Sequence, residues 1–253
     1  MTETSNNTDL HGKTVLITGA AQRVGAQIAH LLHQAGANIV IHYRRSDAEA
    51  KQLQSELNCL RQKSAVIIAA DLAEINSPQR LIGFSIEQFG RLDILINNAS
   101  SFYPTPIGSV NEQQWDDLFC ANLKAPFFLA QAAAPQLQKR HGVIINIVDI
   151  HAERPLRKHT IYSLAKAGLA MLTKSLACEL GPEIRVNGVA PGAIMWPEND
   201  MDDATKKKIM DKTFLKRKGD AMDVARSVLY LCRDATYTTG QILVVDGGRS
   251  LNS

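Results

Sequence analysis

The sequence predicts a doubly wound α/β domain, in which helices cover both faces of one parallel sheet. Three observations support this prediction: a length of 253 residues, a regular alternation of strands and helices, and strands that are apolar throughout. A chain of this length fits one large α/β domain better than two small ones. Strands that are apolar on both sides belong to a sheet that is buried on both faces.

The predicted elements alternate along the chain without an internal linker or repeat. The strands are expected at residues 13–18, 38–43, 64–70, 92–96, 142–148, 185–189 and 241–245. Helices are expected up to about residue 35, at 47–61, 78–89 and 112–139, around residue 162, and before the last strand. Pro126 and Pro135 lie inside the fourth helical stretch, which predicts a break near Asn122 and a kink at Pro135.

Two segments do not fit the alternation. Residues 1–11 are polar and predict a disordered N-terminal tail, which leaves 12–253 as one domain. Residues 193–218 match no element, and an untyped segment of this length in a compact domain is often a lid over a binding site. Trp196 begins this segment, either as part of the pocket wall or in ordinary packing.

The composition excludes several classes of protein. A net charge of +3 is too small to indicate a nucleic acid or an anionic membrane as partner, and no apolar run approaches the ~20 residues of a membrane span. The four cysteines are scattered without metal or redox spacing, as in a reducing cytoplasm. We therefore expect a cytoplasmic protein without a metal site.

The four-residue step from Tyr162 to Lys166 is the first sign of chemistry. On a helix these two side chains share a face, so the lysine charge can lower the pKa of the phenol, which titrates near ~10 in water. Such a pair can act as a general acid at neutral pH. The alternative interpretation is an ordinary solvated helix face.

Turns at the ends of the predicted strands point to a bound dinucleotide. A strand, a glycine-bearing turn and a helix N-terminus form a phosphate site from backbone N–H groups. The turns are Thr18-Gly19-x-x-x-Arg23-x-Gly25, Asp71-Leu72, Asn97-Asn98-Ala99, Pro191-Gly192 and Asp246-Gly247-Gly248. With these motifs the chain resembles the short-chain dehydrogenase/reductases from about Gly12 onward. That family uses an Asn, a Ser, a Tyr and a Lys, and Asn122, Tyr162 and Lys166 match three of them.

Departures from the family pattern suggest a subgroup. Arg23 replaces the middle glycine of the turn, Ser100 the glycine after Asn-Asn-Ala, and Asp149 the catalytic serine. Together with residues 98–106 and 42–46, they resemble the pteridine reductases, with the dihydromonapterin reductases second. The resemblance implies an NADPH-dependent homotetramer that reduces a pterin or folate.

The resemblance also assigns roles to residues. Phe102 would stack on the pterin, Arg23 and Ser100 would reach cofactor phosphate and substrate, and Asp149 with Tyr162 would face the reacting ring. Lys166 would hold the nicotinamide ribose and Asn122 a proton-relay water. The expected cofactor contacts are Gly19, Arg23, Val24, Gly25, Asp71, Leu72, Asn98, Ala99, Ser100, Tyr162, Lys166, Pro191 and Gly192.

Cofactor choice is expected to depend on the end of the second strand. Tyr43, Arg44, Arg45 and Ser46 follow it, with no acid before Asp47. A carboxylate at this place usually selects NAD, whereas guanidinium groups bind the 2′-phosphate of NADP. The residues therefore predict NADPH/NADP+, with solvated arginines as the alternative.

Asp149 bears on the reaction. An ionised carboxylate opposes the negative charge that develops when a ketone is reduced, but it can hold an amino-pyrimidine and assist protonation of a ring nitrogen. Asp149 and Tyr162 therefore favour a C=N substrate, and Phe102 in an exposed loop favours a flat one. Two alternative interpretations remain open, namely that Asp149 only caps its loop and that Phe102 packs in the core. Other open alternatives are a carbonyl or quinone reductase and a non-catalytic NADPH-sensing module.

Overall fold

The protein is built on one parallel sheet whose strands are covered on both faces. The structure is a computed structural model that describes residues 9–194 and 202–252. Seven strands are ordered β3-β2-β1-β4-β5-β6-β7, and all neighbouring pairs are parallel. They are β1 (Thr14–Ile17), β2 (Asn38–Tyr43), β3 (Ala65–Ala69), β4 (Ile94–Asn97), β5 (Val143–Ile147), β6 (Arg185–Pro191) and β7 (Ile242–Val245). The predicted doubly wound sheet is confirmed.

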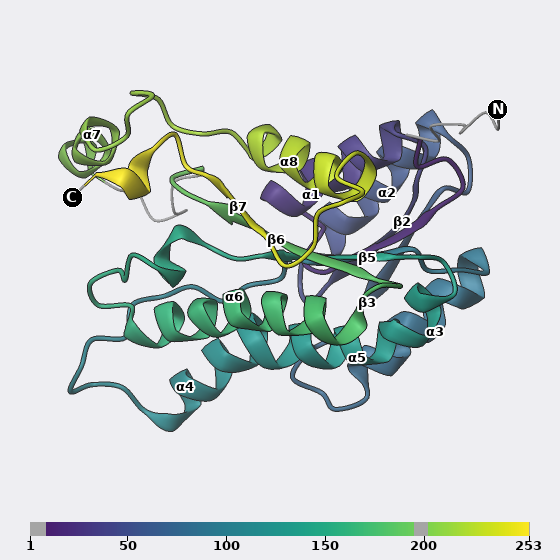
Figure 1. The fold of residues 1–253 in the computed structure, drawn as a ribbon, viewed down its shortest axis with the longest axis horizontal. Coiled ribbons are helices and arrows are strands. Elements are labelled where there is room, and N and C mark those ends of the chain that lie inside the picture. Colours follow the sequence, from purple (N-terminus) through teal and green to yellow (C-terminus); the bar gives the residue numbers. More distant parts are fainter. Residues whose placement is uncertain (1–8, 195–201, 253) are drawn as a thin grey trace.

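Helices form a layer on each side of the sheet (Figure 1). They are α1 (Arg23–Gln34), α2 (Asp47–Leu60), α3 (Ser77–Phe89), α4 (Glu112–Phe119), α5 (Ala125–Gln138), α6 (Thr160–Leu180), α7 (Asp203–Asp211) and α8 (Ala221–Arg233). Helices α1, α2 and α8 cover one face, and α3, α5 and α6 cover the other. Val15 and Ile17 of β1 pack under the first layer and Leu16 under the second, so the strand is apolar on both sides.

The sheet has a switch point between β1 and β4. The chain runs from β1 outward to β2 and β3, and then returns to place β4 on the other side of β1. In open sheets of this kind, ligands bind in the crevice beyond the carboxyl ends of the strands at the switch point. The residues that follow β1 and β4 therefore begin the candidate site.

The regular α-helix of the fourth helical stretch is interrupted near Asn122, where a break is predicted, but the chain stays helical through this point. A π-helical turn, η1 (Cys120–Lys124), separates α4 from α5, and Pro126 lies in the first turn of α5. Pro135 lies inside α5, which continues to Gln138. The wide turn of η1 carries Asn122, which is fully buried. Such π-turns often occur at functional sites.

The predicted N-terminal tail is too long. Leu10 is fully buried in the core cluster beneath α1, and its N–H donates to the Ala35 carbonyl at 3.1 Å. The Leu10 side chain and backbone hydrogen bonds of Leu10 and Gly12 together anchor this part of the chain. Residues 1–8 lie outside the described residues.

The candidate lid contains regular structure. Helix α7 occupies part of the 193–218 segment, and its carboxyl end leads into Phe214 and Leu215, which pack against the Gly247-Gly248 turn. Two short 3-10 turns, η2 (Ile150–Ala152) and η3 (Arg249–Leu251), follow β5 and β7. None of the helices in the described ranges is long and apolar enough to cross a membrane.

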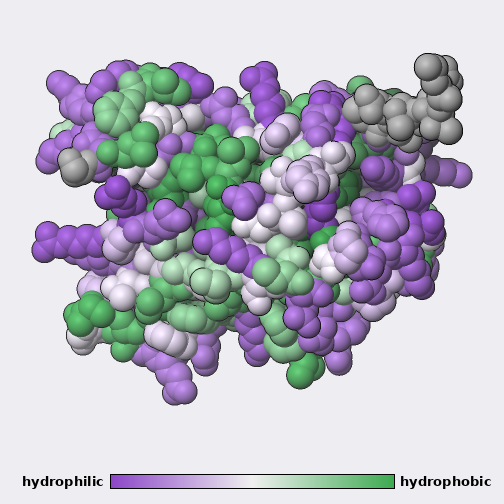
Figure 2. Space-filling view, viewed as in Figure 1, coloured by the Kyte–Doolittle hydropathy of each residue, from purple (hydrophilic) through white to green (hydrophobic). Residues whose placement is uncertain are grey.

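Figure 2 shows hydrophobic residues on the outer surface of the molecule where α6 lies.

Candidate active site

Tyr162, which is buried, and Asp149, which is partly buried, form a hydrogen-bonded pair. Tyr162 lies in the first turn of α6, and its hydroxyl donates to Asp149 Oδ2 at 2.8 Å. Asp149 follows β5 and caps η2, where its Oδ1 accepts the N–H of His151 at 2.8 Å. One carboxylate oxygen therefore holds the loop and the other contacts the phenol. The two interpretations of Asp149, loop cap and site residue, are both consistent with this geometry.

The phenol has a higher pKa than the Tyr-x-x-x-Lys pattern predicts. Burial and the neighbouring charge of Asp149 raise the pKa of Tyr162 well above its ordinary value. The Lys166 ammonium is turned away to the Ile147 carbonyl, 2.8 Å from Nζ, and lies 5.7 Å from the Tyr162 ring centre. Burial lowers the pKa of Lys166 to about 8. The phenol pKa is therefore raised and not lowered, contrary to the expectation from the Tyr-x-x-x-Lys pattern, because burial and then Asp149 determine its direction.

Asn122 is joined to the site through Ser100. Its amide donates to the carbonyls of Ser101 and Leu118, both at 2.9 Å, and its Oδ1 accepts the Ser100 hydroxyl at 2.7 Å. Ser100 also lies beside Tyr162 and acts to lower the pKa of the phenol. Asn122, Ser100, Tyr162 and Asp149 thus form one polar chain across the carboxyl ends of β4 and β5.

An aromatic wall lies next to these polar residues. Phe102 is 48% exposed, stacks on His159 with ring centres 4.7 Å apart, and meets Tyr162 edge-on at 4.8 Å. The Thr105 N–H donates to the Lys158 carbonyl at 2.6 Å and joins the two loops. The sequence alone indicates no role for His159. Its place at the N-cap of α6, three residues before Tyr162, is the signal that could have indicated one.

The β1–α1 turn has the form of a phosphate site. Asn98 Nδ2 donates to the carbonyls of Thr18 and Gly19, both at 2.9 Å, and ties the turn to β4. A Cβ on Gly25 would lie 2.4 Å from the Gly19 carbonyl oxygen, so only glycine permits this approach. The first turn of α1 carries no acidic residue and no side-chain cap, and its N–H groups suit an anion. Arg23 adopts a left-handed φ of 56° at the position where the family has glycine.

Basic residues stand at the end of β2. Arg44 and Arg45 are exposed between Tyr43 and Ser46. The carboxylate of Asp47 accepts the Tyr43 hydroxyl at 2.6 Å and pairs with Lys51 at 2.7 Å. The nearest acid in the sequence is therefore engaged by other partners, and two guanidinium groups remain beside the crevice.

The other predicted cofactor contacts follow neighbouring strands. Asp71 and Leu72 follow β3 and are partly buried, as are Val24, Asn98 and Ala99. Pro191 ends β6, and the Gly192 N–H donates to the Val245 carbonyl at 3.0 Å. All of these residues lie at the carboxyl edge of the sheet. Trp196 lies outside the described residues.

Comparisons with known proteins agree with this geometry. A family model described as enoyl-(acyl carrier protein) reductase matches residues 19–250. Pteridine reductase 1 from Leishmania tarentolae is 37% identical over 93% of this chain and 96% of the relative. A 3-oxoacyl-(acyl-carrier-protein) reductase from Staphylococcus aureus is 35% identical over 93% of this chain and 97% of its own length. The uncharacterized oxidoreductase YohF from Escherichia coli is 35% identical over 93% of this chain and 95% of its own length.

The family model covers the phosphate turn from Gly19, the strands after β1 and the Tyr162–Lys166 pair together. Relatives of nearly equal similarity include reductases with different substrates, so the comparisons indicate the family and the type of reaction. The family implies a nicotinamide cofactor and a small-molecule substrate. The chain is an oxidoreductase that belongs to the short-chain dehydrogenase/reductase family.

Proposed function

We propose that the protein is an NADPH-dependent pteridine reductase, which transfers hydride to a C=N bond of an oxidised or dihydro pterin or folate. The observation that carries this proposal is the hydrogen-bonded pair of Asp149 and Tyr162 beside the exposed ring of Phe102. A flat heterocycle can stack on Phe102 while its amino-pyrimidine edge donates hydrogen bonds to Asp149.

The residues of the site and the cofactor would supply different parts of the reaction. A bound nicotinamide dinucleotide would supply the hydride, held by the β1–α1 turn, the residues after β2 and β3, Asn98, Ala99 and Lys166. The Tyr162 hydroxyl oxygen lies 2.8 Å from Asp149 Oδ2, and Tyr162 can pass its proton to the ring nitrogen. Asn122, whose Oδ1 accepts the Ser100 hydroxyl, would hold a relay water from which that proton is replaced.

We propose NADPH rather than NADH because of Arg44 and Arg45. Both guanidinium groups are exposed at the crevice edge, and Asp47 is occupied by Tyr43 and Lys51. A ribose hydroxyl would find no free carboxylate among these residues, whereas a 2′-phosphate would find two cations. Ser46 adds a hydroxyl at the same place.

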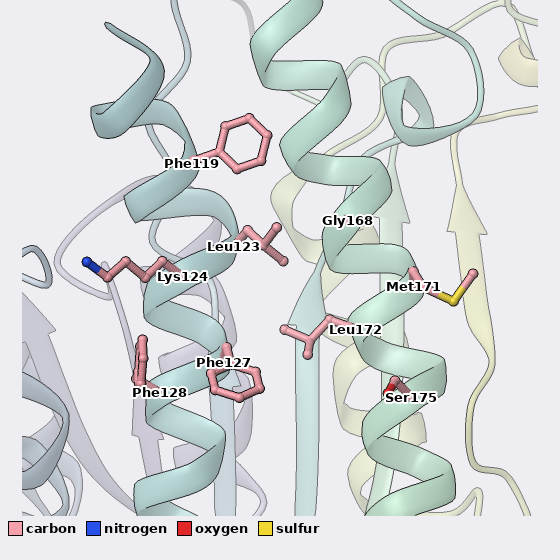
Figure 3. Close-up of a pocket in the computed structure, with 9 residues that line it drawn as sticks. All are labelled: Phe119, Leu123, Lys124, Phe127, Phe128, Gly168, Met171, Leu172 and Ser175. Carbon is pink, nitrogen blue, oxygen red and sulfur yellow. The ribbon is translucent and has the colours of Figure 1, made fainter. Parts of the chain in front are cut away.

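We further propose a cytoplasmic homotetramer. A largely apolar groove of about 470 Å³ lies between η1–α5 and α6 (Figure 3). Phe127, Phe128 and Met171 at this groove are each at least 40% exposed. A second copy of the chain would remove these side chains from water. The free cysteines among the described residues suit a reducing compartment.

A carbonyl reductase is the second candidate, because a 3-oxoacyl reductase is nearly as similar as a pteridine reductase. The deciding experiment measures NADPH oxidation with folate, dihydrobiopterin, dihydromonapterin, a 3-oxoacyl thioester and several ketones and quinones. The proposal requires the highest kcat/KM on a pterin or folate. A preference for dihydromonapterin would select the related reductase. A higher value on ketones would refute the proposal, and binding without turnover would indicate an NADPH-sensing module.

A further inference from the structure

His42 joins the three chain segments at one end of the candidate cofactor site. It lies in β2, directly before the 43–46 segment, and is 2% exposed. Its Nδ1 accepts the N–H of Gly19 at 3.1 Å, and its Nε2 lies 3.1 Å from the Ala70 carbonyl oxygen. The carbonyl of His42 also accepts the N–H of Ala20 at 2.9 Å. One residue therefore binds the turn after β1 and the end of β3.

The two contacts determine the tautomer of the ring. A backbone N–H can only donate, so Nδ1 of His42 is an acceptor and carries no proton. A carbonyl can only accept, so Nε2 carries the proton that it donates to Ala70. The ring is neutral and both nitrogens are used. Burial lowers the pKa of His42 to about 4, which keeps the ring in this form at neutral pH.

The segments that His42 contacts are those that approach the adenosine half of a dinucleotide in this fold. Gly19 opens the phosphate turn, Ala70 precedes Asp71, and Tyr43 is the next residue of the chain. Asn98 holds the phosphate turn from the β4 side through the Thr18 and Gly19 carbonyls. His42 holds the same turn from the β2 side, so the turn is anchored on both sides.

We propose that His42 is a positioning residue for the nicotinamide dinucleotide. His42 fixes how far the phosphate turn, the 43–46 segment and Asp71 lie from one another. It touches neither cofactor nor substrate in this role and acts through Gly19 and Ala70. The proposal goes beyond the pteridine reductase assignment. It depends neither on the substrate nor on the choice between NADPH and NADH.

The test measures binding of NADPH and of NADH by titration calorimetry, together with the melting temperature of the free protein. His42→Phe keeps an aromatic ring of similar size but leaves the Gly19 N–H and the Ala70 carbonyl without partners. The phosphate turn then loses its anchor on the β2 side, and we expect both cofactors to bind roughly five- to a hundredfold more weakly, a loss of about 1–3 kcal/mol. His42→Gln offers one acceptor and one donor, and we expect it to stay within about threefold of wild type.

His33 provides a matched control. It is also buried, at 3% exposure, but its Nε2 lies 2.6 Å from Ser64 Oγ, away from the three segments. His33→Phe should lower the melting temperature and leave both affinities unchanged. Wild-type affinity in His42→Phe, equal weakening in His33→Phe, or no recovery in His42→Gln would each overturn the proposal. If His42→Phe does not fold, His42→Asn replaces it: its side chain reaches Gly19 but not Ala70, and wild-type affinity in that variant overturns the proposal.

Discussion

Replacing Asp149 by serine tests the chemical reason for a C=N substrate. The change removes the hydrogen bond of 2.8 Å to Tyr162 and the charge that would hold an amino-pyrimidine. A hydrogen bond to a charged group is worth about 1.5–3 kcal/mol, so kcat/KM for a pterin should fall roughly ten- to a hundredfold for each such hydrogen bond missing from the transition state. Activity on small reactive ketones should hold or rise, because the repulsion against a developing oxyanion is gone.

The assay compares kcat/KM for dihydrobiopterin and for a reactive ketone in wild type and two variants. A serine hydroxyl can still cap η2 by accepting the His151 N–H, so Asp149→Ser should change the melting temperature little. Asp149→Asn keeps the shape and the capping oxygen but removes the charge. We expect Asp149→Asn to lose pterin activity as well, because the charge rather than the shape holds the substrate.

The outcome that refutes this reasoning is an equal loss on both substrates in Asp149→Ser. That result would mean that Asp149 acts only through the loop it caps, and the chemical argument for a C=N substrate would fail. Full pterin activity in Asp149→Asn would restrict the role of Asp149 to hydrogen-bond geometry.

Three further predictions concern the cofactor, the aromatic wall and acid stability. Arg45→Ala should weaken NADPH about ten- to a hundredfold and leave NADH nearly unchanged; equal losses in calorimetry would contradict the NADPH assignment. Phe102→Ala should raise KM for pterins and lower the free energy of unfolding by less than the ~3–5 kcal/mol of a core Phe→Ala, since the ring is 48% exposed. A stability loss of that full size with an unchanged KM would mean that Phe102 only packs in the core. His33 and His42 have folded pKa values of about 4, lowered by burial from 6.5, so the unfolded state binds more protons as pH falls. Their stabilisation is full above pH 6.5 and is lost between 6.5 and 4, by up to roughly 3 kcal/mol for each ring. Urea unfolding at pH 7, 5.5 and 4.5 checks this, and His33→Gln should show a shallower decline than wild type; identical declines would exclude His33 as a contributor.

The sequence predicts the fold because the strands are apolar on both sides and the turns carry their own signals. Even the π-turn before α5 follows from Pro126, since proline disfavours a regular α-helix in the residues before it. The site is predictable for the same reason. Parallel strands bring their carboxyl ends to one edge, so turns distant in sequence, such as those at Gly19 and Asp71, had to meet.

Other features depend on side-chain contacts that no local pattern records. The ring of His42 reaches Gly19 and Ala70 only because three strands align in register, and the stack of His159 on Phe102 joins two loops. Leu10 is part of the core although its neighbours in sequence are polar. These contacts are tertiary, and spacing along the chain does not determine them.

The direction of the Tyr162 pKa shows how such contacts change the chemistry. Helical spacing places Lys166 on the same face, but its Nζ is 5.7 Å from the ring centre, whereas Asp149 Oδ2 is 2.8 Å from the phenol oxygen. Burial is the largest cause of the raised phenol pKa and the Asp149 carboxylate adds to it, so the phenol holds its proton tightly. A pterin that donates its amino-pyrimidine hydrogens to Asp149 would compete for the same oxygens and weaken that hold. We therefore expect binding of such a substrate to lower the phenol pKa, and a simple ketone, which has no N–H donor, to leave the proton where it is.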